Sequence, residues 1–178
     1  ALVWTRSPVQ RHPLYAVREP LARRVGAVRA DWMMRTRQFN LIPNLQLASN
    51  ASLQMRVIRP LSVNLTEITS YCVAPVGEET EARRRRIRQY EDFFNPSGLA
   101  TPDDTVIFES SQRGFEAGEV MWQQGMARGS NAMRAGSDDY AAELGITPQT
   151  SMSGPFSMAD ETVYHAMYLA WLRRLQDG

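Results

Sequence analysis

The sequence predicts an α+β domain in which an antiparallel β-sheet packs against helices. Three runs of alternating apolar residues between residues 39 and 76 are typical of strands. The segments on both sides of these runs carry apolar residues at helical spacing. A length of 178 residues with 43% hydrophobic residues is ordinary for one compact domain with its own core.

The first expected elements are a strand, a loop and a helix. The opening ALVWTR has the character of the middle of a strand, so we expect the chain to be a fragment of a longer protein. A proline-rich loop that contains His12 follows. Residues 20–36 have apolar positions at helical spacing and predict one helix.

An antiparallel meander is expected next. Its three runs cover residues 39–49, 53–63 and 67–76, and polar or Asn-rich turns separate them. A curved sheet that grips a helix usually encloses a pocket, so we expect a ligand cavity.

Residues 78–95 return to a helical period, and this helix should end before Pro96. Its four consecutive arginines, residues 83–86, could form a nucleic-acid patch. We favour a solvated helix face, because carboxylates lie four residues from the arginines in the pairs Glu79/Arg83 and Glu81/Arg85.

A further helix is expected from residue 102 to about residue 115, after the segment NPSGLATPDD. Thr101 can serve as its N-cap and Pro102 fits the first helical position. Asp103 and Asp104 then complement the positive end of the helix dipole. The same acids could hold a metal, but the local pattern by itself favours the structural role at the helix start. Residues 116–136 lack clean periodicity, and residues 157–176 predict a final amphipathic helix.

Composition excludes several classes. A net charge of +1 gives no argument for nucleic acid or an anionic membrane surface. No apolar run approaches the roughly 20 residues that span a bilayer, so a soluble chain is expected. The single Cys72 rules out an internal disulfide framework and favours a reducing cytoplasm. All 20 basic residues are arginines, which indicates a GC-rich, bacterial genome.

The chain has few residues for catalysis of its own. A mononuclear non-haem iron site takes two histidines and one carboxylate. The only histidines are His12, in a loop, and His165, in the last helix, so a complete triad within the chain is not expected. Asp138 and Asp139 are adjacent on a helix, point in different directions and are not expected to act as an acid/base pair.

Four segments of the sequence nevertheless share one resemblance. RQFNLIPNLQL, QMRVIRPLSVNLTEITSYCVAP, RIRQYEDFFNPSGLATPDD and DETVYHAMYLAW resemble the catalytic domain of the large (α) subunits of Rieske non-haem iron aromatic-ring-hydroxylating oxygenases, closest to the benzoate-type branch. The third segment is the most specific. The resemblance implies an incomplete helix-grip (START-like) domain, with residues 1–178 as the C-terminal part of the catalytic domain. The Rieske domain and two iron-binding histidines would lie upstream.

The resemblance also implies site residues. Asp104 would be the catalytic carboxylate that binds iron, and Asp103 would keep the helix-capping role. Phe94, Leu99 and Ala100 would border the substrate pocket. Ile42 and Asn44, on the Pro-Asn-Leu strand, would border the same cavity. Core packing is an equally good interpretation for Phe94 and Ile42.

The implied cofactors are mononuclear Fe(II), a 2Fe–2S Rieske cluster in the upstream domain, and NAD(P)H acting through a reductase. The implied partners are dioxygen, a benzoate-like aromatic substrate, other large subunits in a trimer, small subunits, and a ferredoxin or reductase. The chain alone should be inactive. The alternative is a metal-free helix-grip module that binds an apolar small molecule and uses Asp104 only at the helix start.

Overall fold

The computed structural model describes residues 15–35, 37–49, 52–119, 125, 127–152 and 160–177. The chain divides into two compact units, residues 1–118 and residues 119–178. The opening ALVWTR and His12 lie outside the described residues. In the described part of the chain, no helix is long and apolar enough to cross a membrane.

The first unit begins with a helical segment that is interrupted. It contains η2 (Tyr15–Val17), α1 (Arg18–Val25) and α2 (Ala27–Met33). The prediction of one continuous helix over residues 20–36 is therefore wrong, because the helix is interrupted near its middle. Gly26 adopts a φ of 88°, which glycine tolerates because it has no Cβ, and this ends α1.

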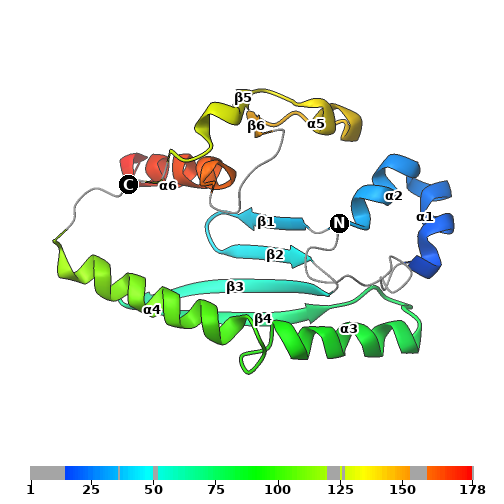
Figure 1. Ribbon diagram of the computed structural model, residues 1–178, viewed down its shortest axis with the longest axis horizontal. Helices are drawn as coiled ribbons and strands as arrows, with labels where there is room; N and C mark the ends of the chain where they lie inside the picture. Colours follow the sequence, from blue (N-terminus) through cyan, green and yellow to red (C-terminus); the bar gives the residue numbers. More distant parts are fainter. Residues whose placement is uncertain are drawn as a thin grey trace. The chain divides into compact units, whose positions relative to one another are not determined.

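An antiparallel sheet follows, as predicted, but it has four strands where three runs were expected, in the order β1-β2-β3-β4 (Figure 1). Its strands are β1 (Arg37–Leu41), β2 (Leu45–Ser49), β3 (Leu53–Ser62) and β4 (Leu65–Val73). The first predicted run, residues 39–49, is two strands. The chain reverses at residues 42–44, where the Ile42–Pro43 peptide is cis and proline cannot donate to a ladder.

The register gives the sheet a polar face. Gln54 lies opposite Ala48 and Cys72, and Arg56 lies opposite Gln46 and Ser70. Because side chains alternate along strands, these residues share one face. We call it the polar face. The opposite, apolar face carries the side chains of Phe39, Leu41, Leu45, Leu47, Leu53, Met55, Val57, Tyr71 and Val73.

Two helices complete this unit, α3 (Thr80–Phe93) and α4 (Thr101–Ala117). Their periodicity predicted both, and α3 ends before Pro96 as expected. The C-terminal end of α3 lies over the polar face, because the Arg56 guanidinium is 5.9 Å from the centroid of the Phe94 ring. The α+β class with an antiparallel sheet and helices is confirmed.

The arginine run on α3 is only partly solvated. Arg84 pairs with Glu81 at 3.2 Å, three residues away, on an exposed surface. The predicted pairs Glu79/Arg83 and Glu81/Arg85 do not form within the described residues. Arg83 instead donates to the carbonyl oxygen of Pro75 at 3.2 Å, in the segment before the helix.

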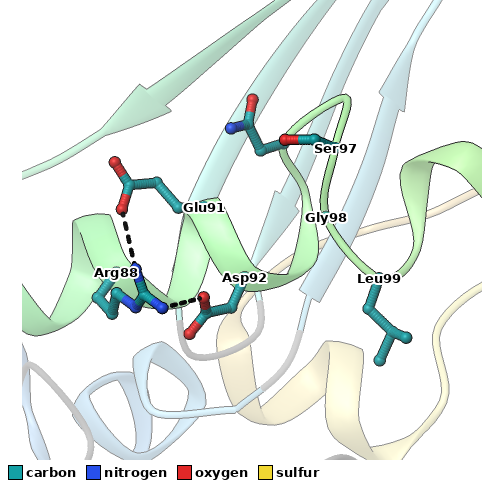
Figure 2. A pocket seen from close by; sticks show the side chains of 7 residues that line it. Arg88, Glu91, Asp92, Ser97, Gly98 and Leu99 are labelled. Carbon is teal, nitrogen blue, oxygen red and sulfur yellow. Dashed lines mark ion pairs between the residues drawn. The ribbon is translucent and has the colours of Figure 1, made fainter.

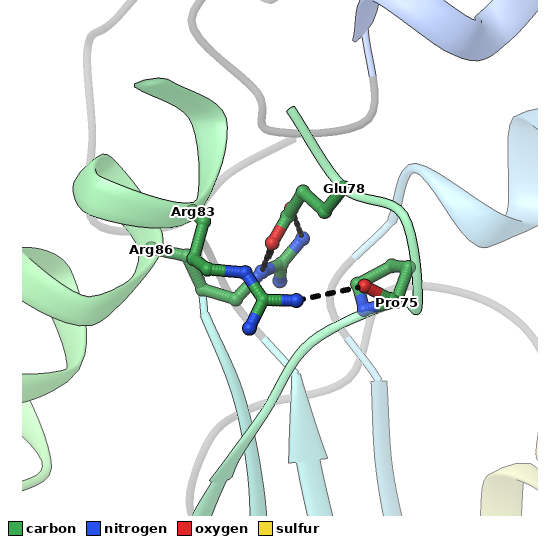
Figure 3. Close-up of polar contacts among 4 residues, drawn as sticks. All are labelled: Pro75, Glu78, Arg83 and Arg86. Atoms are coloured by element: carbon green, nitrogen blue, oxygen red, sulfur yellow. Dashed lines mark hydrogen bonds and ion pairs between the residues drawn. The ribbon is translucent and has the colours of Figure 1, made fainter. Parts of the chain in front are cut away.

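Arg86 corrects the prediction of a fully solvated run, because its side chain is only 6% exposed. Its Nε donates to both carboxylate oxygens of Glu78, and its Nη2 donates to Glu78 Oε1 at 2.5 Å (Figure 3). Glu78 is itself 4% exposed. A buried, bidentate ion pair therefore fixes the start of α3.

The second unit contains η3 (Ser130–Ala132), α5 (Asp139–Leu144), η4 (Thr162–Tyr164) and α6 (His165–Asp177). Its strands β5 (Met133–Ala135) and β6 (Thr150–Met152) pair antiparallel and were not predicted. The final helix is confirmed from residue 165. Asp138 accepts a hydrogen bond from the Ala141 amide at 2.8 Å. It caps α5, which fits the expectation that Asp138 and Asp139 are not an acid/base pair.

Candidate functional site

The loop between α3 and α4 folds back onto the last turn of α3. The Leu99 amide donates to the Asp92 carbonyl at 3.0 Å, and the Ala100 amide donates to the Phe93 carbonyl at 3.0 Å. Gly98 makes this approach possible, because a Cβ there would lie 2.8 Å from the Phe93 carbonyl oxygen. The loop is therefore held by backbone hydrogen bonds and has no room for a side chain at residue 98.

This loop determines where α4 begins. The helix starts at Thr101, with Ala100 at the N-cap, and no side chain caps it. The prediction of Thr101 as N-cap is wrong by one residue, and Asp103 makes no capping hydrogen bond. The reason is that backbone bonds already hold Ala100, so the Thr101 hydroxyl donates instead to the Phe94 carbonyl at 2.7 Å. This bond ties the first turn of α4 to the end of α3.

Asp104 lies in that first turn, and its amide donates to the Ala100 carbonyl at 3.0 Å. Asp103 is exposed, whereas Asp104 is half-buried. Within the described residues, the Asp104 carboxylate has no hydrogen-bond or ion-pair partner, so its oxygens are available to a ligand. An unpaired carboxylate on a rigid helix end suits metal binding.

The described residues do not complete a metal site. They contain no group of three or more His, Cys, Asp or Glu side chains that could hold an ion. His165 is half-buried at the start of α6, in the second unit. Within the described residues, Asp104 is thus an isolated candidate ligand for a metal ion.

Four of the five predicted pocket residues fall in two places. Phe94 is half-buried, with its ring edge-on to Phe93 at 5.0 Å between centroids, and Ala100 adjoins it at the α4 N-cap. Ile42 and Asn44 lie in the turn between β1 and β2, not on a strand as expected. The Asn44 carbonyl accepts from the Ile58 amide on β3 at 2.8 Å.

Leu99, the remaining predicted pocket residue, is 76% exposed. It lines an open hollow with polar neighbours (Figure 2). Arg88 lines this hollow and pairs with Asp92 at 3.1 Å. The hollow is polar and faces outward, so it does not fit an apolar ring. Its lining residues are Arg88, Glu91, Asp92, Asn95, Ser97, Gly98 and Leu99.

Sequence reasoning missed Arg56, which the structure places against Phe94. Its Nη1 donates to Gln46 Oε1 at 3.3 Å. Gln54, two residues earlier, is 0% exposed, and among the described residues neither polar atom of its amide has a hydrogen-bond partner. Strand alternation could have placed Gln54 and Arg56 on one face, but the sequence does not reveal which face meets α3.

Cys72 is half-buried on the polar face and is not an activated nucleophile. Burial raises the pKa of its thiol, and the Arg86 guanidinium only partly opposes this. Less thiolate is present at pH 8 than in a free cysteine. We therefore expect iodoacetamide to alkylate Cys72 more slowly at pH 8 in the folded protein than in the urea-unfolded protein, and we expect the difference between the two rates to shrink as the pH rises. Mass spectrometry of timed samples measures both rates, and a faster reaction in the folded protein would contradict a raised pKa of the Cys72 thiol.

Similar known proteins are the large subunits of bacterial dioxygenases. The 2-halobenzoate 1,2-dioxygenase large subunit of Burkholderia cepacia is 42% identical over 99% of the chain, and the toluate 1,2-dioxygenase subunit alpha of Pseudomonas putida is 43% identical over 98%. The anthranilate 1,2-dioxygenase large subunit of Acinetobacter baylyi is 39% identical over 97%. Nearly the whole chain is therefore similar to one part of a dioxygenase large subunit.

The resemblance inferred from four segments is thereby confirmed. The chain spans 38%, 37% and 36% of the lengths of those three relatives. No protein-family model matches it, and no solved structure gives a significant match.

Proposed function

We propose that the chain is the C-terminal part of the catalytic domain of an aromatic-ring-hydroxylating dioxygenase. The whole enzyme would insert dioxygen-derived oxygen into a benzoate-like aromatic ring. The similarity to large subunits over 97–99% of the chain carries this proposal. The names of these relatives cite halobenzoate, toluate and anthranilate, which are all aromatic carboxylates.

Asp104 is the proposed carboxylate ligand of the mononuclear Fe(II). Its support is the half-buried, unpaired carboxylate on a helix start fixed by backbone bonds. Two histidines from the rest of the protein would complete the site, and the bound iron would supply dioxygen activation through its open positions. Phe94 and Ala100 adjoin this helix start and would border the substrate ring. Leu99, Ile42 and Asn44 keep weaker support, since they lie in the outer hollow and the β1–β2 turn.

The proposal extends to electron supply and assembly. A 2Fe–2S Rieske cluster in the upstream domain would deliver electrons, which a ferredoxin or reductase obtains from NAD(P)H. A trimer of large subunits, with or without small subunits, would bring these parts together.

Asp104→Ala in the complete large subunit tests the proposal. We expect the variant to lose its mononuclear iron while the visible spectrum of the Rieske cluster stays unchanged. Product formation should fall by at least about 100-fold, because even changes to residues that only hydrogen-bond to a metal ligand cost about 10- to 100-fold in affinity or activity. Iron content by mass spectrometry and product by chromatography measure these effects.

Asp103→Ala is the matched control, because Asp103 occupies the same helical turn but is exposed. It should retain its iron and most of its activity. Unchanged iron in Asp104→Ala would contradict the assignment and favour the metal-free module that binds an apolar molecule.

A further inference from the structure

We infer that Arg56 on β3 binds the carboxylate of the aromatic substrate and so selects aromatic acids over neutral aromatics. The inference rests on the proposed function, since it names the recognition group of that same site. Three observations carry it: the position of Arg56, its uncompensated charge, and the polar side chains around it.

The position comes from a continuous series of contacts. The Arg56 guanidinium lies 5.9 Å from the centroid of the Phe94 ring. The Phe94 carbonyl accepts the Thr101 hydroxyl at 2.7 Å, and Thr101 is the first residue of α4. Asp104 lies in the same turn. A cation, an aromatic side chain and the proposed metal ligand therefore belong to one connected group.

The charge of Arg56 is uncompensated within the described residues. It has no carboxylate partner there, and its recorded hydrogen bond goes to the neutral Gln46 amide. Of the two other arginines in the four-stranded sheet, Arg59 pairs with the Glu67 carboxylate at 3.6 Å, whereas Arg37, like Arg56, donates to a neutral acceptor, the Met33 carbonyl, at 3.2 Å. Arg56 differs from both in the face of the sheet on which it lies. Because side chains alternate along a strand, the side chains of Arg37 and Arg59 both lie on the apolar face. Arg56 is thus the sheet arginine that is free to bind an anion on the side of Phe94.

The surroundings hold the guanidinium in place. The Gln46 amide that accepts from Arg56 donates in turn to Asn40 Oδ1 at 3.0 Å. Gln54 adds a fully buried amide with unpartnered donor and acceptor atoms on the same face. Half-burial strengthens charge-assisted hydrogen bonds, because solvent screens them less.

The chemistry of this arrangement matches an aromatic acid. A planar guanidinium can bind a carboxylate through two parallel hydrogen bonds and can also lie against a ring. A benzoate-like anion presents a carboxylate to Arg56 and a flat apolar ring to Phe94. A neutral ring of the same size would leave the Arg56 charge without a partner. We therefore expect the site to discriminate against aromatic substrates that lack a negative charge.

Arg56→Gln in the complete large subunit, with its electron-transfer partners, tests the inference. Benzoate and its neutral analogue benzamide are the probes. We expect kcat/KM for benzoate to fall about 10- to 100-fold, since hydrogen bonds to charged groups contribute about 1.5–3 kcal/mol. The value for benzamide should stay within about 2-fold, because the glutamine keeps a neutral donor. Calorimetric titration should show the same loss in benzoate affinity, independently of turnover.

Two further variants sharpen the result. Arg56→Lys should recover part of the benzoate affinity, because it restores the charge without the planar fork. Arg59→Gln, on the opposite face and paired with Glu67, should change neither substrate. Equal losses for benzoate and benzamide in Arg56→Gln would indicate a structural role and overturn the inference. An unchanged benzoate affinity would overturn it as well.

Failure of the proposed function has a different signature. In that case Asp104→Ala keeps its iron and the wild-type protein oxidises neither probe, while calorimetry still tests Arg56. A wild-type protein that binds no benzoate would overturn the Arg56 inference even if it oxidises other rings.

Discussion

Arg86→Met is expected to lower the free energy of unfolding by about 3–5 kcal/mol, because it leaves a buried carboxylate without its partner. Glu78 is 4% exposed and receives three hydrogen-bond contacts from Arg86. Without the guanidinium, Glu78 must be buried as a lone charge, take up a proton, or pull the start of α3 apart. Urea denaturation followed by circular dichroism measures the change.

Glu81→Gln provides the control on the same helix. Its pair with Arg84 is exposed, so the loss should be no more than about 1 kcal/mol. The double variant Arg86→Met/Glu78→Leu should recover much of the stability, because neither charge then remains buried. A loss for Arg86→Met no larger than that of the control would refute the importance of this pair.

Gly98→Ala is the second change with a large expected effect, a loss of about 1–3 kcal/mol from overpacking. The added Cβ would lie 2.8 Å from the Phe93 carbonyl oxygen and 3.0 Å from that of Asn95. Both contacts are backbone atoms, so relief requires the loop to move and its hydrogen bonds to lengthen. We expect the complete large subunit with this variant to retain less mononuclear iron, because the loop sets the start of α4.

For Gly114→Ala we expect the opposite effect on the free energy of unfolding. Gly114 lies within α4, and an added Cβ would meet nothing within 4 Å. Alanine should stabilise the helix by about 0.5–1 kcal/mol. Thermal unfolding of both variants therefore tests the sign as well as the size of each effect. A Gly98→Ala protein as stable as Gly114→Ala would contradict the close-packed loop.

The helices and strands were predicted well where the pattern of apolar residues repeats over neighbouring positions. Apolar spacing places α3 and α4 correctly, because an amphipathic helix repeats its signal over several turns. Single-residue events escaped prediction. Gly26 divides one expected helix, and the turn at Pro43 divides one expected strand. Each interruption depends on the backbone conformation at a single residue, which a periodic pattern of side chains does not reveal.

Prediction of the candidate site from the sequence was limited in a similar way. The role of Asp104 as a metal ligand rests on the resemblance and stays a prediction. Thr101 was assigned the wrong role, because its hydroxyl donates to a carbonyl seven residues earlier. Arg86 looks like its solvated neighbours in the sequence, and only the packing of α3 distinguishes it. The contact of Arg56 with Phe94 joins two elements far apart in the chain, so no local signal reports it.

The bond from Thr101 to Phe94 has a consequence for redesigning the protein. Phe94 ends α3 and its carbonyl anchors α4, so a shift of α3 displaces the aromatic side chain and the Asp104 turn together. Under the proposed function, in which Asp104 binds the iron and Phe94 borders the substrate, any change in α3 would couple substrate preference to metal geometry. Arg56 stands on a separate element, the sheet. Substitutions along β3 are therefore the route by which such a protein could acquire new substrates while its metal site stays intact.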